Sequence, residues 1–253
     1  MTHAPIVLVV NCNTDERMTE AIAESARSAA RPGTRIVGIG PSWGPSSAEG
    51  YVESFATAVA TMDAVASYDG PFDAVVMAGF GEHGREGMRQ LVTQPVIDIT
   101  EASAFLACLV AHRFGVVTTV RSAVAGIEDS LRSTGILERC AGIVAGDLPV
   151  SHIAESRAQT HAALRDGAGA LLAAGADAIV LGCAGFAGLD RELERELGVP
   201  VIDGVASAVA LAESLVGLGK RTSRAGPFAP ADTAKPWRGP RFGAGFAPVP
   251  LQT

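Results

Sequence analysis

Short apolar runs alternate with amphipathic stretches along most of the chain. Runs such as Ile6–Val10 and Ala178–Leu181 are apolar throughout, which is typical of parallel strands covered on both faces. The stretches between them place apolar residues at helical spacing. This alternation predicts an α/β fold of parallel sheets flanked by helices, with functional sites at the carboxyl ends of the strands.

The expected elements follow directly from this pattern. Strands are expected at Ile6–Val10, Arg35–Gly38, Ala74–Met77, Val96–Ile97, Phe114–Val117, Gly142–Val144, Ala178–Leu181 and Val201–Ile202. Helices are expected at Arg17–Ala30, Glu49–Ala66, Ser103–His112, Ala123–Ser133, Glu155–Ala174 and Ala206–Leu218.

Two distant segments of the chain repeat one another. Asp73–Gly84 reads DAVVMAGFGEHG and Asp177–Gly188 reads DAIVLGCAGFAG, and PVID follows each of them, at Pro95 and at Pro200. Two buried strands can resemble each other by chance, but the matched PVID favours an internal duplication. A duplication predicts two pseudo-symmetric lobes with the active site in the cleft between them.

The lobes have expected boundaries. Residues 1–98 and 204–221 are expected to form the N-terminal lobe, and residues 99–203 the C-terminal lobe. From Thr222 the composition changes to Gly, Pro and Ala. Such a stretch cannot bury a core, so residues 222–253 are expected to form an extended or disordered tail. The tail is locally basic, and a solubilising or subunit-wrapping role is favoured over binding. Its basic residues are Arg224, Lys235, Arg238 and Arg241.

Composition excludes several classes of function. The net charge is −7 and the body of the chain has no basic cluster, so nucleic acid is not an expected partner. No apolar run is long enough for a bilayer and the start has no signal-peptide pattern, so a cytoplasmic protein without membrane contact is expected. The 4 cysteines show no metal-ligand spacing and are expected to be free thiols. No nucleotide-binding glycine motif opens a helix after a strand, so nucleotide binding has no support.

The two copies of the repeat differ at the position where a catalytic side chain is most expected. Cys183 follows a strand in the second copy, whereas Gly79 occupies the equivalent position in the first. A helix that begins just after Cys183 would lower the pKa of its thiol and favour the thiolate. The alternative is an inert buried cysteine.

Several motifs in their order along the chain resemble the hydantoin racemase branch of the aspartate/glutamate racemase superfamily. They are NCNT, GPSSAEGY, DAVVMAGFGEHG, FGVVTT, GADAIVLGCAGFAGL and PVIDGVASAV, and they lie between Ile6 and about Leu218. The resemblance implies a cofactor-free enzyme that acts on the acidic C–H of a small molecule and assembles as a homo-oligomer. It also implies two cysteines that face each other across the substrate carbon. The second of them corresponds to Cys183, and the first corresponds to Gly79, in AGFGEHG where the family reads ACFGDPG.

Three interpretations of Gly79 are open at this stage. In the first, another group replaces the missing thiol: Cys12, which stands where the family usually has proline, or His83, which titrates near neutrality when solvated. In the second, Cys183 alone protonates an enediolate formed by loss of carbon dioxide, as in arylmalonate decarboxylase, and Gly79 leaves room for the departing carboxylate. In the third, the chain is an inactive homologue or a variant engineered at this position.

Polar groups near the strand ends are candidates for substrate binding. Asn11, Asn13 and Thr14, with Thr118 and Thr119 in the other half, are suited to donate hydrogen bonds to an imide or carboxylate, although strand-end capping is an alternative role. Ser46 is expected to border the entrance. The backbone amides of Phe80, Gly81, Ala184 and Gly185 are suited to binding an oxyanion, because small residues allow close approach. The sequence thus predicts a hydantoin racemase-like enzyme with Cys183 as its principal acid/base, and a one-cysteine decarboxylase as the alternative.

Overall fold

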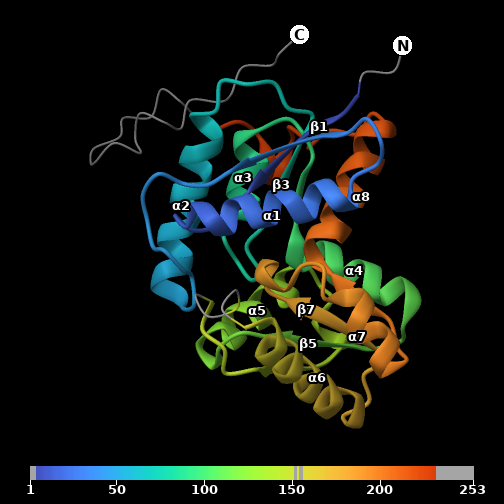
Figure 1. Cartoon of the computed structure of the whole chain (residues 1–253). Coiled ribbons are helices and arrows are strands. Elements are labelled where there is room, and N and C mark those ends of the chain that lie inside the picture. The colour runs from blue at the N-terminus through green and yellow to red at the C-terminus, as the bar shows by residue number, and fades with distance from the viewer. Residues whose placement is uncertain (1–3, 151–152, 154–155, 232–253) are drawn as a thin grey trace.

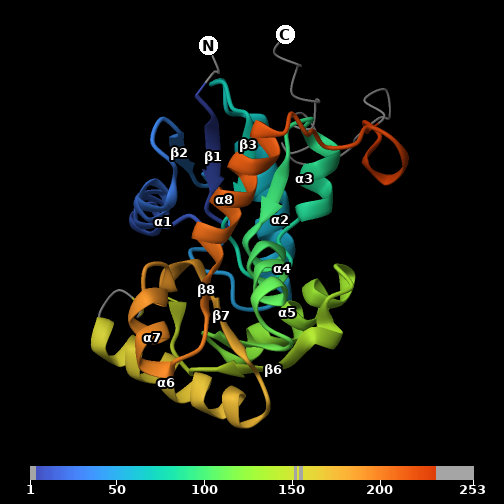
Figure 2. The ribbon, with the colours of Figure 1, turned by 90° about the vertical axis from the view of Figure 1, so that its right-hand side faces the viewer.

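The computed structural model describes residues 4–150, 153 and 156–231, and shows two lobes stacked on one another (Figures 1 and 2). Each lobe is built on a four-stranded sheet in which every strand pair is parallel. The first sheet has the order β2-β1-β3-β4 and the second the order β6-β5-β7-β8. The repeated segments therefore supply the equivalent strands β3 and β7, as a duplication predicts.

The strands lie close to their expected positions. They are β1 (Ile6–Val10), β2 (Arg35–Ile39), β3 (Ala74–Met77), β4 (Val96–Asp98), β5 (Phe114–Thr118), β6 (Cys140–Ala145), β7 (Ala178–Gly182) and β8 (Val201–Asp203). The helices are α1 (Glu16–Ala29), α2 (Tyr51–Ala66), α3 (Arg85–Leu91), α4 (Ile99–Val110), α5 (Arg121–Ser133), α6 (Arg157–Ala173), α7 (Asp190–Leu197) and α8 (Gly204–Gly217).

Two helices escaped the sequence analysis and one begins earlier than expected. The helices α3 and α7 are short and densely charged, so their apolar spacing gives little signal. The helix α4 begins at Ile99 instead of Ser103, because Asp98 and Glu101 form a capping box around its first turn.

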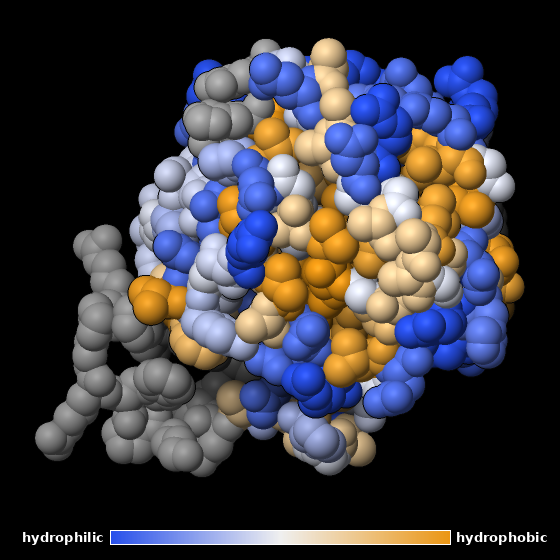
Figure 3. All heavy atoms as spheres, turned by 90° about the horizontal axis from the view of Figure 1, so that it is seen from below, coloured by the Kyte–Doolittle hydropathy of each residue, from blue (hydrophilic) through white to orange (hydrophobic). Residues whose placement is uncertain are grey.

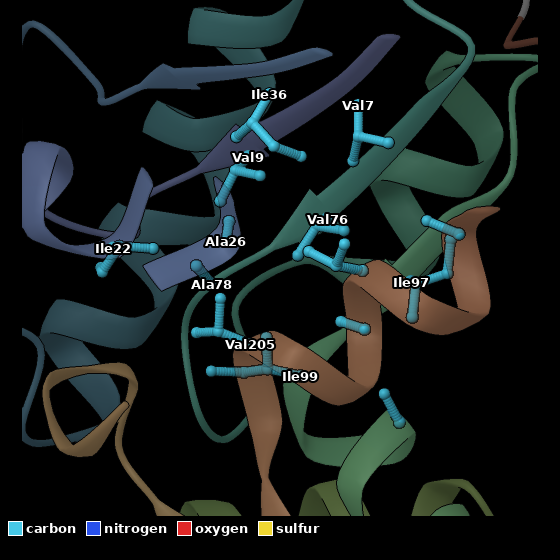
Figure 4. Close-up of a cluster of buried hydrophobic side chains, with 14 of the residues drawn as sticks. Val7, Val9, Ile22, Ala26, Ile36, Val76, Ala78, Ile97, Ile99 and Val205 are labelled. Atoms are coloured by element: carbon cyan, nitrogen blue, oxygen red, sulfur yellow. The ribbon is translucent and has the colours of Figure 1, made fainter. Parts of the chain in front are cut away.

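The core of the first lobe is divided by its sheet. Val7 and Val9 of β1 point to one face, where they pack with Ile22 of α1 and Val205 of α8 (Figure 4). Leu8 and the other alternate residues of β1 point to the opposite face, toward α2 and α3. Strands that are apolar on both faces are needed because helices cover both sides of the sheet.

The two lobes exchange a helix at their junction. After β4 the chain enters α4, which packs against β7 and α5 of the second lobe, and after β8 it enters α8, which packs against β3 and α1 of the first lobe. The two helices also pack on each other, and a Cβ added at Gly204 would lie 3.1 Å from the backbone oxygen of Ile99. Ile99 and Gly204 each follow a PVID motif, so this contact joins equivalent positions of the two repeats. The lobe boundaries at residues 98/99 and 203/204 stay a prediction.

The first residues after α8 differ from the expected extended tail. Thr222 donates to the backbone oxygen of Gln94 at 2.6 Å, and the Arg224 guanidinium donates to three carbonyls at the end of α3. A cation at a helix carboxyl end pairs with its unsatisfied carbonyl groups. Residues 222–231 are thus packed on the first lobe, whereas the rest of the predicted tail, with Lys235, Arg238 and Arg241, lies outside the described residues.

The outer surface carries apolar side chains among charged ones. Seen from below in the orientation of Figure 3, apolar groups gather between charged patches. The exposed large apolar residues include Phe105, Leu109 and Val110 on α4 and Val52 and Phe55 on α2. None of the helices within the described ranges has the length and apolar character that crossing a bilayer requires. Homo-oligomer formation and a cytoplasmic location stay predictions.

A buried arginine at the start of α3 joins the two lobes. Arg85, the first residue of α3, has a fully buried side chain. Its guanidinium donates to Ser133 Oγ at 2.9 Å and Ser130 Oγ at 3.3 Å, both on α5 of the second lobe. It also lies near four carboxylates, at 2.9 Å from Glu86, 3.4 Å from Glu82, 3.6 Å from Glu101 and 3.7 Å from Asp98. Arg85 therefore joins carboxylates of the first lobe to one carboxylate, Glu101, and two hydroxyls of the second.

Replacing Arg85 by methionine is expected to destabilise the fold strongly. The change leaves Asp98, which is fully buried, without its cation, and a broken buried ion pair costs about 3–5 kcal/mol. The free energy of unfolding should be measured by urea denaturation. Arg27→Met is the matched control, because Arg27 pairs with Glu20 and Glu24 on the solvent side of α1, and it should lose far less. Equal losses in the two variants would contradict the interlobe role of Arg85.

Candidate active site

The carboxyl ends of β1, β3, β5 and β7 meet at one buried cavity between the lobes. Its volume is about 40 Å³, which leaves room for only a few water molecules. The lining residues come from the ends of these four strands and the loops after them, from α1 and α5, and from the segments before α2 and after β6. They are Asn11, Cys12, Asn13, Met18, Ala48, Ala78, Phe80, His83, Thr118, Thr119, Ala123, Val150, Gly182, Cys183 and Ala184. The arrangement agrees with a site at the carboxyl ends of parallel strands.

Cys183 lies at the end of β7, on the wall formed by the second lobe. A three-residue 3₁₀ turn, Ala184–Phe186, begins just after it, and the Gly185 N–H donates to Cys183 Sγ at 3.4 Å. Burial raises the pKa of the Cys183 thiol to about 11, although this N–H acts in the opposite direction. The expected lowering of the pKa is therefore wrong: a single short turn supplies little helix dipole, and desolvation of the thiolate outweighs it.

Cys12 lies on the opposite wall, in the loop after β1 of the first lobe. Burial and, as the second cause, the negative charge that Cys183 carries as a thiolate together raise the pKa of its thiol to about 12. Both groups are therefore thiols near neutral pH. Because each charge disfavours the other, the cavity holds at most one thiolate at a time.

The space in front of Gly79 is filled. A Cβ added at Gly79 would lie 2.4 Å from Cδ2 of His83 and 2.7 Å from Cβ of Cys12. No side chain fits at that position while these two neighbours stay in place. The expectation that Gly79 leaves room for a departing carboxylate is therefore wrong, because Cys12 and His83 occupy that room.

His83 is a buried residue and not a solvated loop residue. Its side chain packs into the cavity wall with only 4% of the residue exposed, and Nε2 lies 3.3 Å from the backbone oxygen of Phe80. Burial lowers the pKa of His83 to about 4. The expected titration near neutrality is wrong, because the buried imidazolium would lose its hydration without gaining a carboxylate partner.

The other predicted site residues fall into two groups. Those that line the cavity are Asn11, Asn13, Phe80, Thr118, Thr119 and Ala184. Four more do not line it: Thr14, Ser46, Gly81 and Gly185. Thr14 bonds the backbone oxygen of Pro45, and the Gly81 amide donates to Thr100 Oγ1 at 2.8 Å. The Gly185 amide faces the Cys183 sulfur instead of a substrate oxygen.

Three residues that the sequence analysis did not name help to close the cavity. Glu49 accepts a hydrogen bond from the Val150 amide at 2.9 Å, so a loop of the first lobe is tied to the second lobe at the cavity wall. The negative charge of Glu49 also contributes to the raised pKa of Cys183. Met18 lines both the cavity and a neighbouring groove of about 480 Å³, which runs along α1 and also contacts Val150. Glu49 lies within the motif GPSSAEGY, whereas no local pattern distinguishes Met18 or Val150 from core residues.

Metal ligands are not gathered in the part of the chain that the structure describes. No group of three or more His, Cys, Asp or Glu side chains there is placed to hold a metal ion.

Comparison with known proteins identifies the family. Residues 7–212 match the family model described as Asp/Glu/Hydantoin racemase. The chain is 37% identical over 220 residues to a hydantoin racemase of Pseudomonas sp. (strain NS671), covering 86% of this chain and 88% of that protein. It is 46% identical to the allantoin racemase from Pseudomonas fluorescens, whose crystal structure superposes with a TM-score of 0.89. The superposition covers 93% of this chain and 100% of that one. The chain belongs to the Asp/Glu/hydantoin racemase family, a family of isomerases.

A more distant likeness concerns the fold alone. Unliganded arylmalonate decarboxylase is 19% identical to this chain, with a TM-score of 0.58 over 84% of this chain and 93% of that one.

Gly79→Cys is expected to destabilise the protein by about 1–3 kcal/mol, because the new side chain overpacks against His83 and Cys12. The second change His83→Ala, made in the same chain, should recover part of this loss by removing the closest contact. Thermal or urea unfolding of the single and double variants measures both effects. Gly169→Cys is the control, because no atom lies within 4 Å of a Cβ at Gly169. A Gly79→Cys protein as stable as wild type would show that the space is open.

His83 is expected to make the fold sensitive to acid. Its pKa is lower in the folded state, about 4, than the ordinary value of 6.5, so the unfolded chain binds a proton that the native chain does not. Stability is unaffected by His83 above pH 6.5 and falls as the pH drops from 6.5 toward 4, by about 2 kcal/mol at pH 5. The loss of stability between pH 7 and pH 5 should shrink by this amount in His83→Gln. It should persist in His112→Gln, which changes an exposed histidine. An unchanged acid response in His83→Gln would refute the buried neutral imidazole.

Proposed function

We propose that this protein racemises a 5-substituted hydantoin or a related cyclic ureide by proton transfer at C5, with Cys183 and Cys12 as the acid/base pair. One observation carries the proposal. Thiols from opposite lobes line the same buried cavity, and Cys12 Cβ lies 2.7 Å from the position that a Cβ at Gly79 would take. Cys12 thus places a thiol beside the position at which the family pattern has its first cysteine.

The proposed reaction needs one thiolate and one thiol at a time. One sulfur, as thiolate, removes the C5 proton and becomes a thiol, while the C5–H electron pair moves into an enolate at the adjacent carbonyl. The opposite thiol then donates its proton to the other face of C5 and becomes the thiolate. A full cycle leaves the protein with the proton on the other sulfur, ready for the reverse direction.

Burial has opposite effects on the amount of thiolate and on its strength as a base. A raised pKa makes the thiolate scarce, but it also makes each thiolate a stronger base toward a weak carbon acid. The mutual repulsion of the two charges supports the required state with a single thiolate. A cavity with room for only a few water molecules also strengthens hydrogen bonds to the developing enolate oxygen.

The relatives and the neighbouring groove support the substrate class. The relatives carry the names hydantoin racemase and allantoin racemase. The buried cavity is small, and a substituent at C5 has space in the groove beyond Met18, whose flexible side chain forms part of both walls. The groove also contains Arg17 and Arg157, so a polar end on the substituent finds donors there.

A one-cysteine decarboxylase is the alternative activity. The glycine at position 79 favours it, because a single proton donor suffices once loss of carbon dioxide has formed the enediolate. The filled space in front of Gly79 disfavours it, since a departing carboxylate needs room and the wall there is occupied by His83 and Cys12.

Cys12→Ala and Cys183→Ala are expected to affect the two enantiomers differently. With hydantoin enantiomers in deuterium oxide, proton NMR follows C5–H exchange and polarimetry follows racemisation. Each single variant should lose racemisation by at least about 1,000-fold, because one face of C5 lacks its proton donor or acceptor. The sulfur that remains should still exchange the C5 proton of one enantiomer with retention of configuration.

Controls separate this outcome from the alternatives. Cys108→Ala removes a thiol that does not line the cavity and should leave racemisation unchanged. Wild-type racemisation in Cys12→Ala would remove Cys12 from the mechanism. Carbon dioxide release from an arylmalonate without any hydantoin exchange would favour the lyase, and neither activity in the unaltered chain would indicate an inactive homologue.

A further inference from the structure

Two buried acceptor atoms on the first-lobe wall of the cavity have no protein partner among the described residues. They are Asn11 Oδ1 and His83 Nδ1, and both residues line the cavity. Three further atoms without a partner, Thr57 Oγ1, Asp98 Oδ2 and His161 Nε2, belong to residues that do not line it. Buried polar atoms are normally paired, and the two at the cavity are placed where a bound molecule can pair them.

The hydrogen-bond network fixes the free end of Asn11 as its oxygen. The Asp15 amide donates to Asn13 Oδ1 at 3.0 Å, which identifies that atom as the oxygen of the Asn13 side chain. Asn11 Nδ2 donates to the same oxygen at 2.9 Å and to the Asp15 carbonyl at 3.3 Å. Asn11 therefore uses its N–H groups to hold its own loop. The sequence-based expectation that it donates to a substrate is replaced by an acceptor role.

The free ring nitrogen of His83 is also an acceptor. Nε2 lies 3.3 Å from the Phe80 carbonyl, which can only accept, so Nε2 carries the hydrogen. In the neutral imidazole Nδ1 then has a lone pair and no hydrogen. A donor is available nearby as well: Asn13 Nδ2 is bonded only to the weak acceptor Met18 Sδ, at 3.3 Å.

We propose that Asn11 and His83 are specificity-determining residues that accept hydrogen bonds from two N–H groups of an uncharged ureide, while Asn13 donates to its carbonyl oxygen. A ureide offers two N–H donors and a carbonyl, which matches this wall group for group. A carboxylate offers only acceptors, so it would leave both protein acceptors unpaired and bring a charge into a dry cavity. This inference rests on the proposed function and names the chemical feature that selects the substrate.

The test uses ligands that have no stereocentre and so cannot be racemised. Binding of 5,5-dimethylhydantoin to the full chain is measured by isothermal titration calorimetry, beside its 1-methyl and 3-methyl derivatives and dimethylmalonate. A site built to pair a buried N–H rejects an analogue that lacks it strongly, so each N-methyl derivative should bind at least about 100-fold more weakly. Dimethylmalonate should not compete. Unsubstituted hydantoin serves as a smaller ligand in the same series.

A cycle of variants assigns the His83 contact. His83→Phe keeps a ring in front of Gly79 but removes the acceptor. In this variant, one of the two N-methyl derivatives should no longer bind more weakly than 5,5-dimethylhydantoin. His83→Gln restores an acceptor and should restore part of the discrimination. His112→Phe, at an exposed position, should leave every affinity unchanged. Thermal melting of each variant shows whether it is folded.

The outcomes separate this inference from the proposed function. Equal affinities for the parent and both N-methyl derivatives, preferential binding of the dicarboxylate, or no binding of either hydantoin would overturn the roles of Asn11 and His83. Selective binding of the parent ligand without C5 exchange of any monosubstituted hydantoin would uphold these roles and refute racemisation.

Discussion

The contact between the first turns of α4 and α8 sets the geometry on which the site depends. These turns approach so closely that a Cβ at Gly204 would come within 3.1 Å of the Ile99 carbonyl. Each helix leaves one lobe and packs on the other, which brings the carboxyl ends of both parallel sheets to a common cavity. The buried guanidinium of Arg85 holds the same junction from behind, through carboxylates of both lobes and hydroxyls of the second.

Desolvation is the main physical consequence of this closure. It raises the pKa of both cavity thiols and lowers that of His83, so all three groups are uncharged near neutral pH. A neutral cavity suits a neutral substrate, and it turns any thiolate that forms into a strong base. The same desolvation leaves Asn11 Oδ1 and His83 Nδ1 as unsatisfied acceptors, which connects the acid/base proposal with the proposed recognition of N–H groups.

Position 79 shows how closely neighbouring residues constrain one another. The side chains of Cys12 and His83 fill the space that a residue larger than glycine would need at this position. Protein interiors are close-packed, so a larger residue 79 requires at least one of these neighbours to change as well.

Local pattern was sufficient for most of the architecture. Alternating apolar runs and helical spacing predicted the eight strands, six of the helices and the two-lobed duplication, because burial on both faces of a parallel sheet leaves a strong apolar signal. The repeated DAxV segments also marked Cys183 and position 79 as equivalent. The short charged helices α3 and α7 left no such signal, because most of their residues are polar.

The state of each functional group was decided only by tertiary structure. Burial, and not residue type, sets the pKa of Cys183 and His83, and burial arises from segments that are distant in sequence. Hydrogen bonds within the Asn11–Asp15 loop decide that the free end of Asn11 is an acceptor. The sequence by itself determined the fold and where its chemistry lies. The assembled lobes decided which groups are charged, which are paired and which remain free for a substrate, because electrostatics and hydrogen bonding depend on neighbours that only folding brings together.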